Sequence, residues 1–559
     1  MVKMKKHTSK LFELVLLEII LVFVIPVTLY SQDHHDWSYN LSIYEVNVRQ
    51  YTGAGTFGDF ETHLDRLRDL GVGILWFMPI HPIGVKNRIG SLGSYYSVKD
   101  YYGVNPEFGT LDDFIALVDS VHAKGMYVLM DWVANHTSWD NALTITHPEW
   151  YIKDNEGNFT PPPGTDWSDV IQLDYSKQGL RDYMINAMKF WIDTADVDGF
   201  RCDAAGFVPI DFWSEAITEL KNDKLGIFML AEDSGTKYYS AGFDMTYAWG
   251  YYGFGNGILM NIVAETNNAN VLNSFVTQEN SNYPAPDYRM YFTSNHDENS
   301  WYGAVFERFG DAAEEFAVLT STFRSMPLIY SGQEAGLNHR LEFFDKDEII
   351  WKPDTLAYIY STLLHLKKEN KALWNGNDGG QLQRVTTTDN PSIFAFIREK
   401  GDDKVFEIFN LTGQEKTFTM QGTLYTGKYR NVFTNDSVSF SENTEMTLPG
   451  WGYKVYEYKS DITDVRGGRS VPEQFNLSQN YPNPFNPTTS IEYQISEAGF
   501  VSLKLYDVLG NEIETLVNKQ QLSGKYEITF NAENLVSGVY LYKIQINDFV
   551  SSKKMLLLK

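Results

Sequence analysis

Segments with strand character alternate with segments of helical character about eight times between residues 42 and 369. One helix, for example, is expected to begin at a capping box formed by Thr110 and Asp113 and to end at Gly125. A buried apolar strand, 126–132, follows it directly. Regular alternation of this kind is typical of a parallel sheet whose strands are joined by helices. The pattern predicts an α/β fold, a closed (β/α)8 TIM barrel, over residues 32–375.

Three of the predicted strands end in an acidic residue. The runs DGFRCD, FMLAE and FTSNHD end in Asp203, Glu232 and Asp297. The spacing leaves room for one strand–helix unit between the first two acids and about two units between the last two. Because the carboxyl ends of barrel strands meet at one mouth, we expect the three carboxyl groups to lie near one another.

Basic residues accompany these acids. Arg201 lies two positions before Asp203, so both side chains are expected on one face of the strand, where the guanidinium would lower the pKa of the carboxyl group. His296 precedes Asp297, and His136 follows another strand. Retaining cleavage of a glycosidic bond needs a nucleophilic carboxylate, a carboxyl acid/base and stabilisation of an oxocarbenium-like transition state. The residues therefore indicate a site that cleaves glycosidic bonds.

Four segments resemble, in the right order, the four sequence regions of the α-amylase family of glycoside hydrolases, glycoside hydrolase family 13. They are DWVANH at 131–136, GFRCD at 199–203, the strand ending at Glu232, and NHD at 295–297. The resemblance implies that Asp203 is the nucleophile, that Glu232 is the general acid/base and that the last Asp of the fourth segment, Asp297, stabilises the transition state.

The resemblance also implies a set of sugar contacts. The segment 95–101 is similar to one whose aromatic residue stacks on the sugar at the cleavage site, which points to Tyr96. Many starch-cleaving members have Lys-His where this chain has Gly206 and Phe207. An aromatic platform is therefore expected there, and the preference for the leaving group stays open. The substrate-binding residues implied in this way are Tyr96, His136, Arg201, Phe207 and His296.

The segment 137–171 is rich in Trp, Pro, Gly and Asp and shows no clear periodicity. In the family this position holds a small excursion, domain B, that forms one wall of the cleft. Its oxygen donors are not spaced as in an EF-hand loop, and solvated loop acids are the favoured interpretation. We expect no required cofactor, with calcium as an open alternative and Asn135 as its candidate ligand. The oxygen donors in question are Asp140, Asp154, Glu156 and Asn158.

Short alternating strand patterns replace the helical patterns after the barrel. Residues 376–458 are expected to form the β-sandwich called domain C in the family, and the polar segment 459–474 is expected to be a linker. Residues 475–559 resemble the C-terminal sorting domain of type IX secretion cargo, with YDVLG at 506–510 and SGVY at 537–540. A terminal starch-binding domain is the alternative. The resemblance implies contact with the secretion machinery and export across a Gram-negative outer membrane, with release or attachment at the surface.

The amino terminus and the composition agree with export. Residues 1–31 have a Lys-rich start and an apolar middle, as a signal peptide does, with an uncleaved anchor as the alternative. The chain has 46 Lys and Arg against 72 Asp and Glu, a formal net charge of −26, which argues against a nucleic-acid partner. Its one cysteine, Cys202, allows no internal disulfide and is expected to point away from Arg201 and Asp203.

Together these features predict a secreted retaining α-glucan hydrolase that cleaves α-1,4 bonds of starch, glycogen or maltooligosaccharides. Cyclomaltodextrinase, α-glucosidase and glucanotransferase activities remain alternatives, because these enzymes use the same acids and differ in the substrate or acceptor that they admit. A non-catalytic glucan-binding protein is a more distant alternative, since none of the three acids is missing. The sequence leaves the oligomeric state and the choice between endo and exo action open.

Overall fold

The computed structural model describes residues 34–252, 257–283, 287–324, 326–458, 475–496, 499–521, 524–547 and 549–559. The predicted signal peptide, 1–31, and the predicted linker, 459–474, lie outside the described residues. Within the described part of the chain, no helix is both long enough and apolar enough to cross a membrane.

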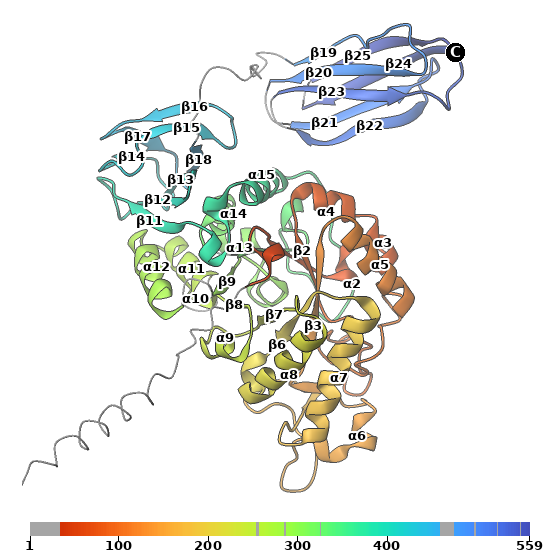
Figure 1. Ribbon diagram of the computed structural model, residues 1–559, viewed down its shortest axis with the longest axis vertical. Coiled ribbons are helices and arrows are strands. Elements are labelled where there is room, and N and C mark those ends of the chain that lie inside the picture. Colours follow the sequence, from red (N-terminus) through yellow and green to blue (C-terminus); the bar gives the residue numbers. More distant parts are fainter. Residues whose placement is uncertain are drawn as a thin grey trace, which may run out of the picture.

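Eight parallel strands close into a barrel (Figure 1). Their order around the barrel, β1-β10-β9-β8-β7-β6-β3-β2, follows the chain, with β4 and β5 lying outside the ring. The predicted (β/α)8 fold is confirmed. The strands are β1 (Ile43–Val46), β2 (Ile74–Phe77), β3 (Tyr127–Val133), β6 (Gly199–Asp203), β7 (Phe228–Ala231), β8 (Met245–Tyr247), β9 (Tyr288–Tyr291) and β10 (Met326–Tyr330).

The strands β6 and β7 approach each other closely where they begin. Gly199 pairs with Phe228 across these strands, and a Cβ atom at Gly199 would lie only 2.0 Å from the Phe228 carbonyl oxygen. Every residue of both strands is buried, since one face lines the barrel interior and the other lies under the helices. A residue without a side chain is therefore needed at this position for the two strands that carry Asp203 and Glu232 to pair in this register.

Helices surround the barrel, and α5 begins at the predicted capping box: the Thr110 side chain accepts from the Asp113 N–H and the Asp113 carboxylate accepts from the Thr110 N–H. The segment 57–70 forms two helices, α3 and α4. Sequence analysis missed α12, which is rich in Asn, Ser and Thr, weak helix formers. The main helices are α3 (Phe57–Glu61), α4 (Leu64–Leu70), α5 (Leu111–Ala123), α7 (Gln178–Ala195), α8 (Ile210–Asp223), α12 (Asn270–Asn282), α14 (Ala313–Thr322) and α15 (Thr355–Glu369).

The excursion after β3 is closed by a short antiparallel pair, β4 (His136–Ser138) with β5 (Val170–Gln172). It lies at the lower end of the barrel in Figure 1. The pair anchors both ends of the excursion near the mouth of the barrel. The remaining short helices are α2 (Val48–Tyr51), α6 (Leu143–Thr146) within the excursion, α9 (Lys237–Ala241), α10 (Trp249–Tyr252), α11 (Ile258–Val263) and α13 (Val305–Phe309).

A β-sandwich follows the barrel. Its larger sheet has the order β11-β12-β13-β18-β15-β16, and β14 pairs with β17 in a smaller one. The strands β12 and β13 form a hairpin around Gly401. The strands are β11 (Gln381–Val385), β12 (Ile393–Lys400), β13 (Asp403–Asn410), β14 (Lys416–Thr419), β15 (Gly427–Asn431), β16 (Ser437–Phe440), β17 (Glu445–Leu448) and β18 (Tyr453–Tyr458).

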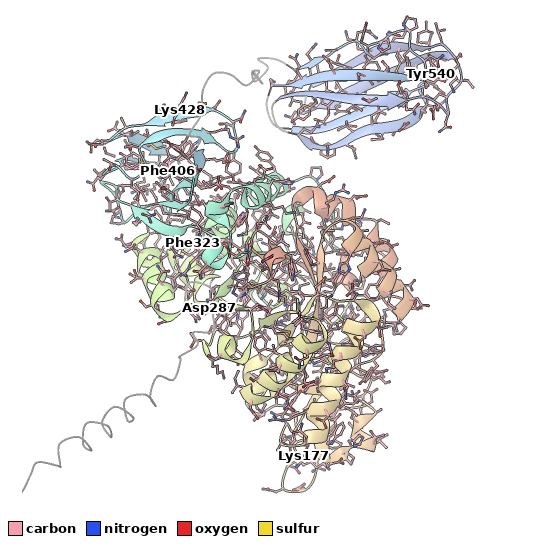
Figure 2. The ribbon with its side chains drawn as sticks, viewed as in Figure 1. Lys177, Asp287, Phe323, Phe406, Lys428 and Tyr540 are labelled. Atoms are coloured by element: carbon pink, nitrogen blue, oxygen red, sulfur yellow. The ribbon has the colours of Figure 1, made fainter. Side chains whose placement is uncertain are left out.

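The sandwich and the barrel share one apolar core. Phe394 and Phe396 of β12 belong to the same buried cluster as the barrel residues, and their rings lie 6.3 Å and 6.2 Å from that of Phe323. Phe323 lies where the barrel helices meet the sandwich strands (Figure 2). The buried Arg398 donates to the carbonyl oxygens of Thr322 at 3.1 Å and Trp374 at 2.9 Å. Both apolar and polar contacts therefore join the two parts.

The C-terminal part forms two antiparallel sheets with the orders β19-β20-β23 and β22-β21-β24-β25. Its core is a separate cluster drawn from residues 477–557, and buried and less buried residues alternate along β20 and β21. The strands are β19 (Asn476–Leu477), β20 (Thr488–Ile495), β21 (Gly499–Tyr506), β22 (Glu512–Gln521), β23 (Gly524–Asn531), β24 (Gly538–Ile546) and β25 (Phe549–Leu557).

The shared core predicts that a sandwich residue stabilises the barrel. Phe396→Ala is expected to destabilise the barrel by about 3 kcal/mol, because a large buried ring is lost from the joint cluster. Thermal unfolding followed by tryptophan fluorescence measures this. The matched control is Phe530→Ala, a buried Phe of the C-terminal cluster, which is expected to leave the unfolding of the barrel unchanged. Unfolding of the barrel at the wild-type temperature in Phe396→Ala would contradict the shared core.

Candidate active site

Arg201 is the centre of an acidic cluster that contains two of the three predicted acids, Asp203 and Glu232, together with Asp131, which sequence analysis did not single out. Its guanidinium is fully buried at the mouth, with Nη1 2.8 Å from Asp131 Oδ1 and 2.9 Å from Asp203 Oδ1, and with Nη2 2.8 Å from Glu232 Oε1. Asp203 is the last residue of β6 and Glu232 directly follows β7. As the period-2 alternation predicted, Arg201 and Asp203 lie on one face. The cluster therefore gathers three carboxylates from three adjacent strands on one cation.

Aromatic side chains enclose the guanidinium. The Arg201 carbon Cζ lies 5.1 Å from the Trp76 ring centre and 5.7 Å from the Tyr96 ring centre, and Nε donates to the Tyr247 hydroxyl at 3.2 Å. Although burial lowers it, the carboxylates, chiefly Asp131, raise the pKa of Arg201 well above its usual value. The cation is thus permanently charged, and its position is fixed by contacts on every side.

Burial raises the pKa of both candidate catalytic carboxyl groups. The pKa of Asp203 rises to about 7 and that of Glu232 to about 7, although Arg201 lowers each. Arg201 does lower the pKa of Asp203, as expected, but burial raises it by more, since the cation is shared with Asp131 and Glu232. Glu232 Oε2 accepts from the Ala204 N–H at 2.6 Å. The site therefore retains a proton near neutral pH, as general acid catalysis requires.

His296 connects Asp297 to the barrel wall. Its Nδ1 lies 2.5 Å from Glu45 Oε1, its Nε2 lies 2.8 Å from the Tyr96 hydroxyl, and the same Nε2 lies 3.5 Å from Asp297 Oδ2. Although burial lowers it, Asp297 and Glu45 raise the pKa of His296 to about 9, so the ring is an imidazolium at neutral pH. Asp297 follows β9 and keeps a side chain that is 40% exposed. Its carboxylate is thus accessible from the cleft.

Glu45 is a site residue that sequence analysis missed. It is fully buried in β1, whose other residues are apolar or aromatic. Besides the His296 ring, its carboxylate accepts from the His296 backbone N–H at 3.3 Å. The signal that could have identified Glu45 was a single acid within a short strand that is otherwise apolar. A buried charge in a protein is paired, so such an acid indicates a partner elsewhere in the chain.

Tyr96 lies over the cluster, as the resemblance implied. Its ring stacks on His296 with 5.3 Å between centroids and 23° between planes, and its hydroxyl donates to Asp131 Oδ2 at 3.0 Å. Phe343, from the segment after β10, stacks on Tyr96 at 6.2 Å and 9°. Sequence analysis did not identify Phe343. The two rings form the beginning of an aromatic wall.

The other predicted sugar contacts lie on the side of the excursion. His136 hydrogen-bonds to the Tyr96 backbone, and burial lowers its pKa to about 4, so its ring is neutral. The His136 ring lies 5.3 Å from Trp167, and Trp167 lies 6.0 Å from Phe207. Phe207 is 47% exposed. Trp167 was also missed, although a Trp in an aperiodic loop beside a cleft was a usable signal.

Two of the oxygen donors considered for calcium, Asp154 and Asp140, are engaged in contacts within the protein. Asp154 accepts from the N–H groups of Glu156 and Asn158 and so stabilises a turn. Asp140 binds Lys99 and accepts from the N–H of Val85. The Asn135 amide nitrogen lies 3.2 Å from His136 Nδ1. In the part of the chain that the structure describes, no three His, Cys, Asp or Glu residues are grouped so that they could hold a metal ion.

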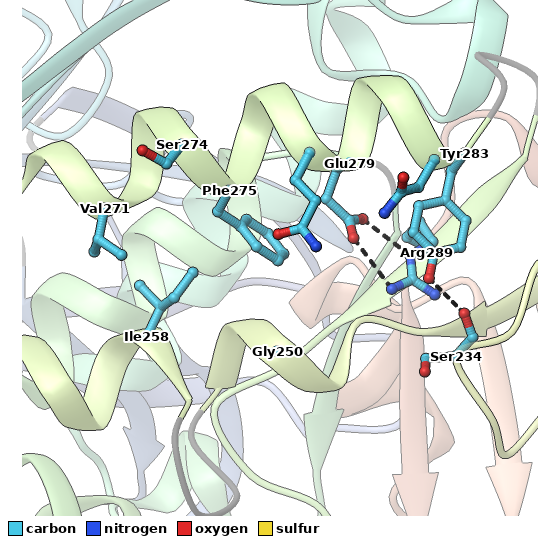
Figure 3. A pocket seen from close by; sticks show the side chains of 11 residues that line it. Ser234, Gly250, Ile258, Val271, Ser274, Phe275, Glu279, Tyr283 and Arg289 are labelled. Carbon is cyan, nitrogen blue, oxygen red and sulfur yellow. Dashed lines mark hydrogen bonds and ion pairs between the residues drawn. The ribbon is translucent and has the colours of Figure 1, made fainter.

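A cavity of about 360 Å³ lies beneath α12 (Figure 3) and is not lined by the predicted site residues. Its polar groups bind one another: Arg289 Nε lies 3.0 Å from Glu279 Oε2, and the Tyr283 hydroxyl donates to the Ser234 carbonyl oxygen at 2.5 Å. The side chains that line the cavity therefore hold the loop after β7, and the cavity does not extend the acidic cluster.

Three family models match the chain. The α-amylase catalytic domain matches residues 42–405, and the C-terminal domain of the α-amylase SusG matches residues 393–452. The secretion system C-terminal sorting domain matches residues 479–558, so the protein is exported to the exterior or to the cell surface.

Known proteins are similar over most of the chain. The alpha-amylase MalA of Haloarcula japonica is 26% identical over 438 residues, which cover 74% of this chain and 62% of MalA, less than two thirds of that relative. The solved structure of the maltogenic alpha-amylase AmyB from Thermotoga neapolitana has a TM-score of 0.68 and 30% identity, covering 75% of this chain and 98% of AmyB. The alpha-amylase from Lactobacillus plantarum has a TM-score of 0.67 and 32% identity, covering 75% and 99%. With a family model that spans most of the barrel and the first part of the sandwich, this chain belongs to the α-amylase family of glycoside hydrolases.

Proposed function

We propose that this protein is a secreted retaining hydrolase of α-1,4-glucans, acting on starch, glycogen or maltooligosaccharides. The observation that supports this most is the placement of Asp203 and Glu232 on the two terminal nitrogens of one buried guanidinium. Retaining enzymes need two carboxyl groups separated by roughly 5 Å, and a guanidinium fork brings two carboxylates close together.

The reaction assigns one role to each acid. Glu232 protonates the glycosidic oxygen while the Asp203 carboxylate attacks the anomeric carbon, which breaks the glycosidic bond and forms a covalent glycosyl-enzyme. Glu232, now ionised, takes a proton from water as the water oxygen attacks the anomeric carbon. The bond between that carbon and the Asp203 oxygen breaks, which releases the Asp203 carboxylate. The exposed carboxylate of Asp297 stabilises the positive charge that develops on the sugar ring.

The neighbouring residues hold the sugar that is attacked. The Tyr96 ring offers a flat face for stacking, the His296 imidazolium holds the Tyr96 hydroxyl through Nε2, and the neutral His136 ring is placed to hydrogen-bond a sugar hydroxyl. Arg201 orients Asp203 through a bond of 2.9 Å. These contacts act before the bond breaks, so their loss should weaken binding as well as catalysis.

Glucan transfer is the second candidate. Phe207 and Trp167 form an apolar surface on the side expected to receive the leaving group. Such a surface binds a sugar face and disfavours water, which promotes transfer of the glycosyl group to a second sugar. The cyclomaltodextrin glucanotransferase of Geobacillus stearothermophilus is 26% identical over 484 residues, covering 74% of this chain and 64% of that protein.

Removal of the nucleophile provides the direct test of the assignment. Asp203→Asn is expected to lower kcat on amylose by several orders of magnitude with little loss of stability, because the amide is isosteric but not nucleophilic. Reducing-sugar release and thermal unfolding measure the two effects. Asp119→Asn, at an exposed position of α5, is the matched control and should keep full activity. Near-normal turnover in Asp203→Asn would refute the nucleophile assignment.

The pKa values predict a bell-shaped dependence of kcat/KM on pH centred near 7. Activity should fall at higher pH as the acid/base loses its proton, because Glu232 has a pKa raised to about 7, and at lower pH as Asp203 gains one. The two limbs belong to the interacting pair rather than to either residue alone. Initial rates on maltoheptaose across the pH range measure the profile. A flat profile through neutrality would contradict these roles.

Product analysis separates the candidates. Amylose, maltoheptaose and β-cyclodextrin are each incubated with the enzyme and with Asp203→Asn. A ladder of short maltooligosaccharides from amylose, absent with the variant, is the expected outcome for a hydrolase that attacks internal bonds. Products longer than maltoheptaose would indicate transfer, and preferential ring opening would indicate a cyclomaltodextrinase. The absence of any product from all three would refute the proposal.

A further inference from the structure

Asp297 continues directly into a single π-helical turn, Glu298–Tyr302. Such turns are rare and occur frequently at functional sites. The turn buries Glu298 and Asn299 but leaves Trp301 46% exposed and Tyr302 45% exposed. Two large aromatic side chains are therefore exposed to solvent directly beside the Asp297 carboxylate.

Trp301 makes a direct contact with Asp297. Its indole N–H donates to Asp297 Oδ1 at 3.2 Å, while Asp297 Oδ2 lies 3.5 Å from His296 Nε2. The two oxygens of a partly exposed carboxylate are thus held from two sides, by His296 and by Trp301. A carboxylate that must face the developing positive charge of the sugar benefits from a fixed orientation.

The exposed ring of Trp301 also extends the aromatic wall that begins at Tyr96. The indole lies 5.1 Å from Phe343 and 5.8 Å from Phe344, and Phe343 stacks on Tyr96. Phe207 follows β6 and Trp301 follows β9, three strands away around the barrel. At Trp301 the wall is therefore carried by a strand that is distant from the strand carrying Phe207.

The turn is held rigidly enough to present this surface. The Asn299 side chain accepts from the Leu341 N–H at 2.8 Å and donates to the His339 carbonyl oxygen at 3.1 Å. The Arg340 guanidinium donates to the Trp301 carbonyl oxygen at 3.3 Å. These bonds fasten the turn to the segment that carries Phe343, so the ring does not depend on a free loop.

We propose that Trp301 has two roles: its indole N–H positions Asp297, and its exposed ring binds a second glucose unit of an α-glucan beyond the one stacked on Tyr96. The inference rests on the proposed function and extends it, because it makes chain length a determinant of affinity. Substrates long enough to reach Trp301 gain a stacking contact, whereas shorter substrates do not.

Two variants separate the two roles. Trp301→Phe keeps a flat ring and loses the N–H, so kcat should fall about tenfold or more with KM for maltoheptaose nearly unchanged, as for a lost bond to a charged group. Trp301→Ala loses both and should in addition raise KM for maltoheptaose about fivefold, as for a lost aromatic contact. Trp351→Phe removes an indole N–H that donates to the Tyr51 carbonyl oxygen at 2.6 Å and is the matched control. It should change neither constant.

Binding without turnover separates failure of this inference from failure of the proposed function. Calorimetry with maltoheptaose on Asp203→Asn, with and without Trp301→Ala, measures the stacking contact even if no product forms. An equal Kd in the two proteins would overturn the binding role. A wild-type kcat in Trp301→Phe would overturn the positioning role. If the wild-type protein showed no activity on any glucan, this result would instead count against the proposed function alone.

Discussion

The buried guanidinium of Arg201 is the interaction on which the mouth of the barrel depends. Taking a cation out of water costs several kcal/mol, and only well-placed carboxylates offset this. Its partners come from β3, β6 and the end of β7, so the charge ties together three adjacent strands. The same shared cation cannot hold every carboxylate ionised. The retained proton has the opposite cause, since burial raises the pKa values of Asp203 and Glu232 while Arg201 lowers both.

Two aromatic surfaces lie beside the acids. One surface begins at Tyr96 and runs through Phe343, and the other is formed by Trp167 and Phe207. Sugar rings bind such surfaces through their faces, while hydroxyl groups at the edges reach polar residues. The acids beside the surfaces are chemically equivalent in hydrolases and transferases. The difference between the two outcomes depends on how long the second surface retains a sugar after the first bond breaks.

Sequence analysis predicted the barrel because helix and strand periodicities recur along the chain, and it predicted Asp203, Glu232 and Asp297 because each follows a strand. It missed residues whose function depends on distant partners. Glu45 acquires its role from His296, 251 positions later, and no local pattern encodes that contact. The helix α12 forms because of its packing, although the intrinsic helix preference of its residues is low. The lowering of the Asp203 pKa by Arg201 could be predicted from their spacing, but the larger opposing effect of burial could not, because it depends on how distant parts of the chain cover the carboxyl group.

The joint core of the barrel and the sandwich bears on how such proteins exchange parts. Recombination that replaced the sandwich with that of a relative would set a foreign surface against Phe323 and remove Arg398, the donor to the Thr322 and Trp374 carbonyl oxygens. The sorting domain has a core of its own, drawn from residues 477–557. Joining it to another protein breaks no part of that core. The sandwich is thus expected to be exchanged only together with its barrel, whereas the sorting domain can be joined to other proteins as a secretion signal.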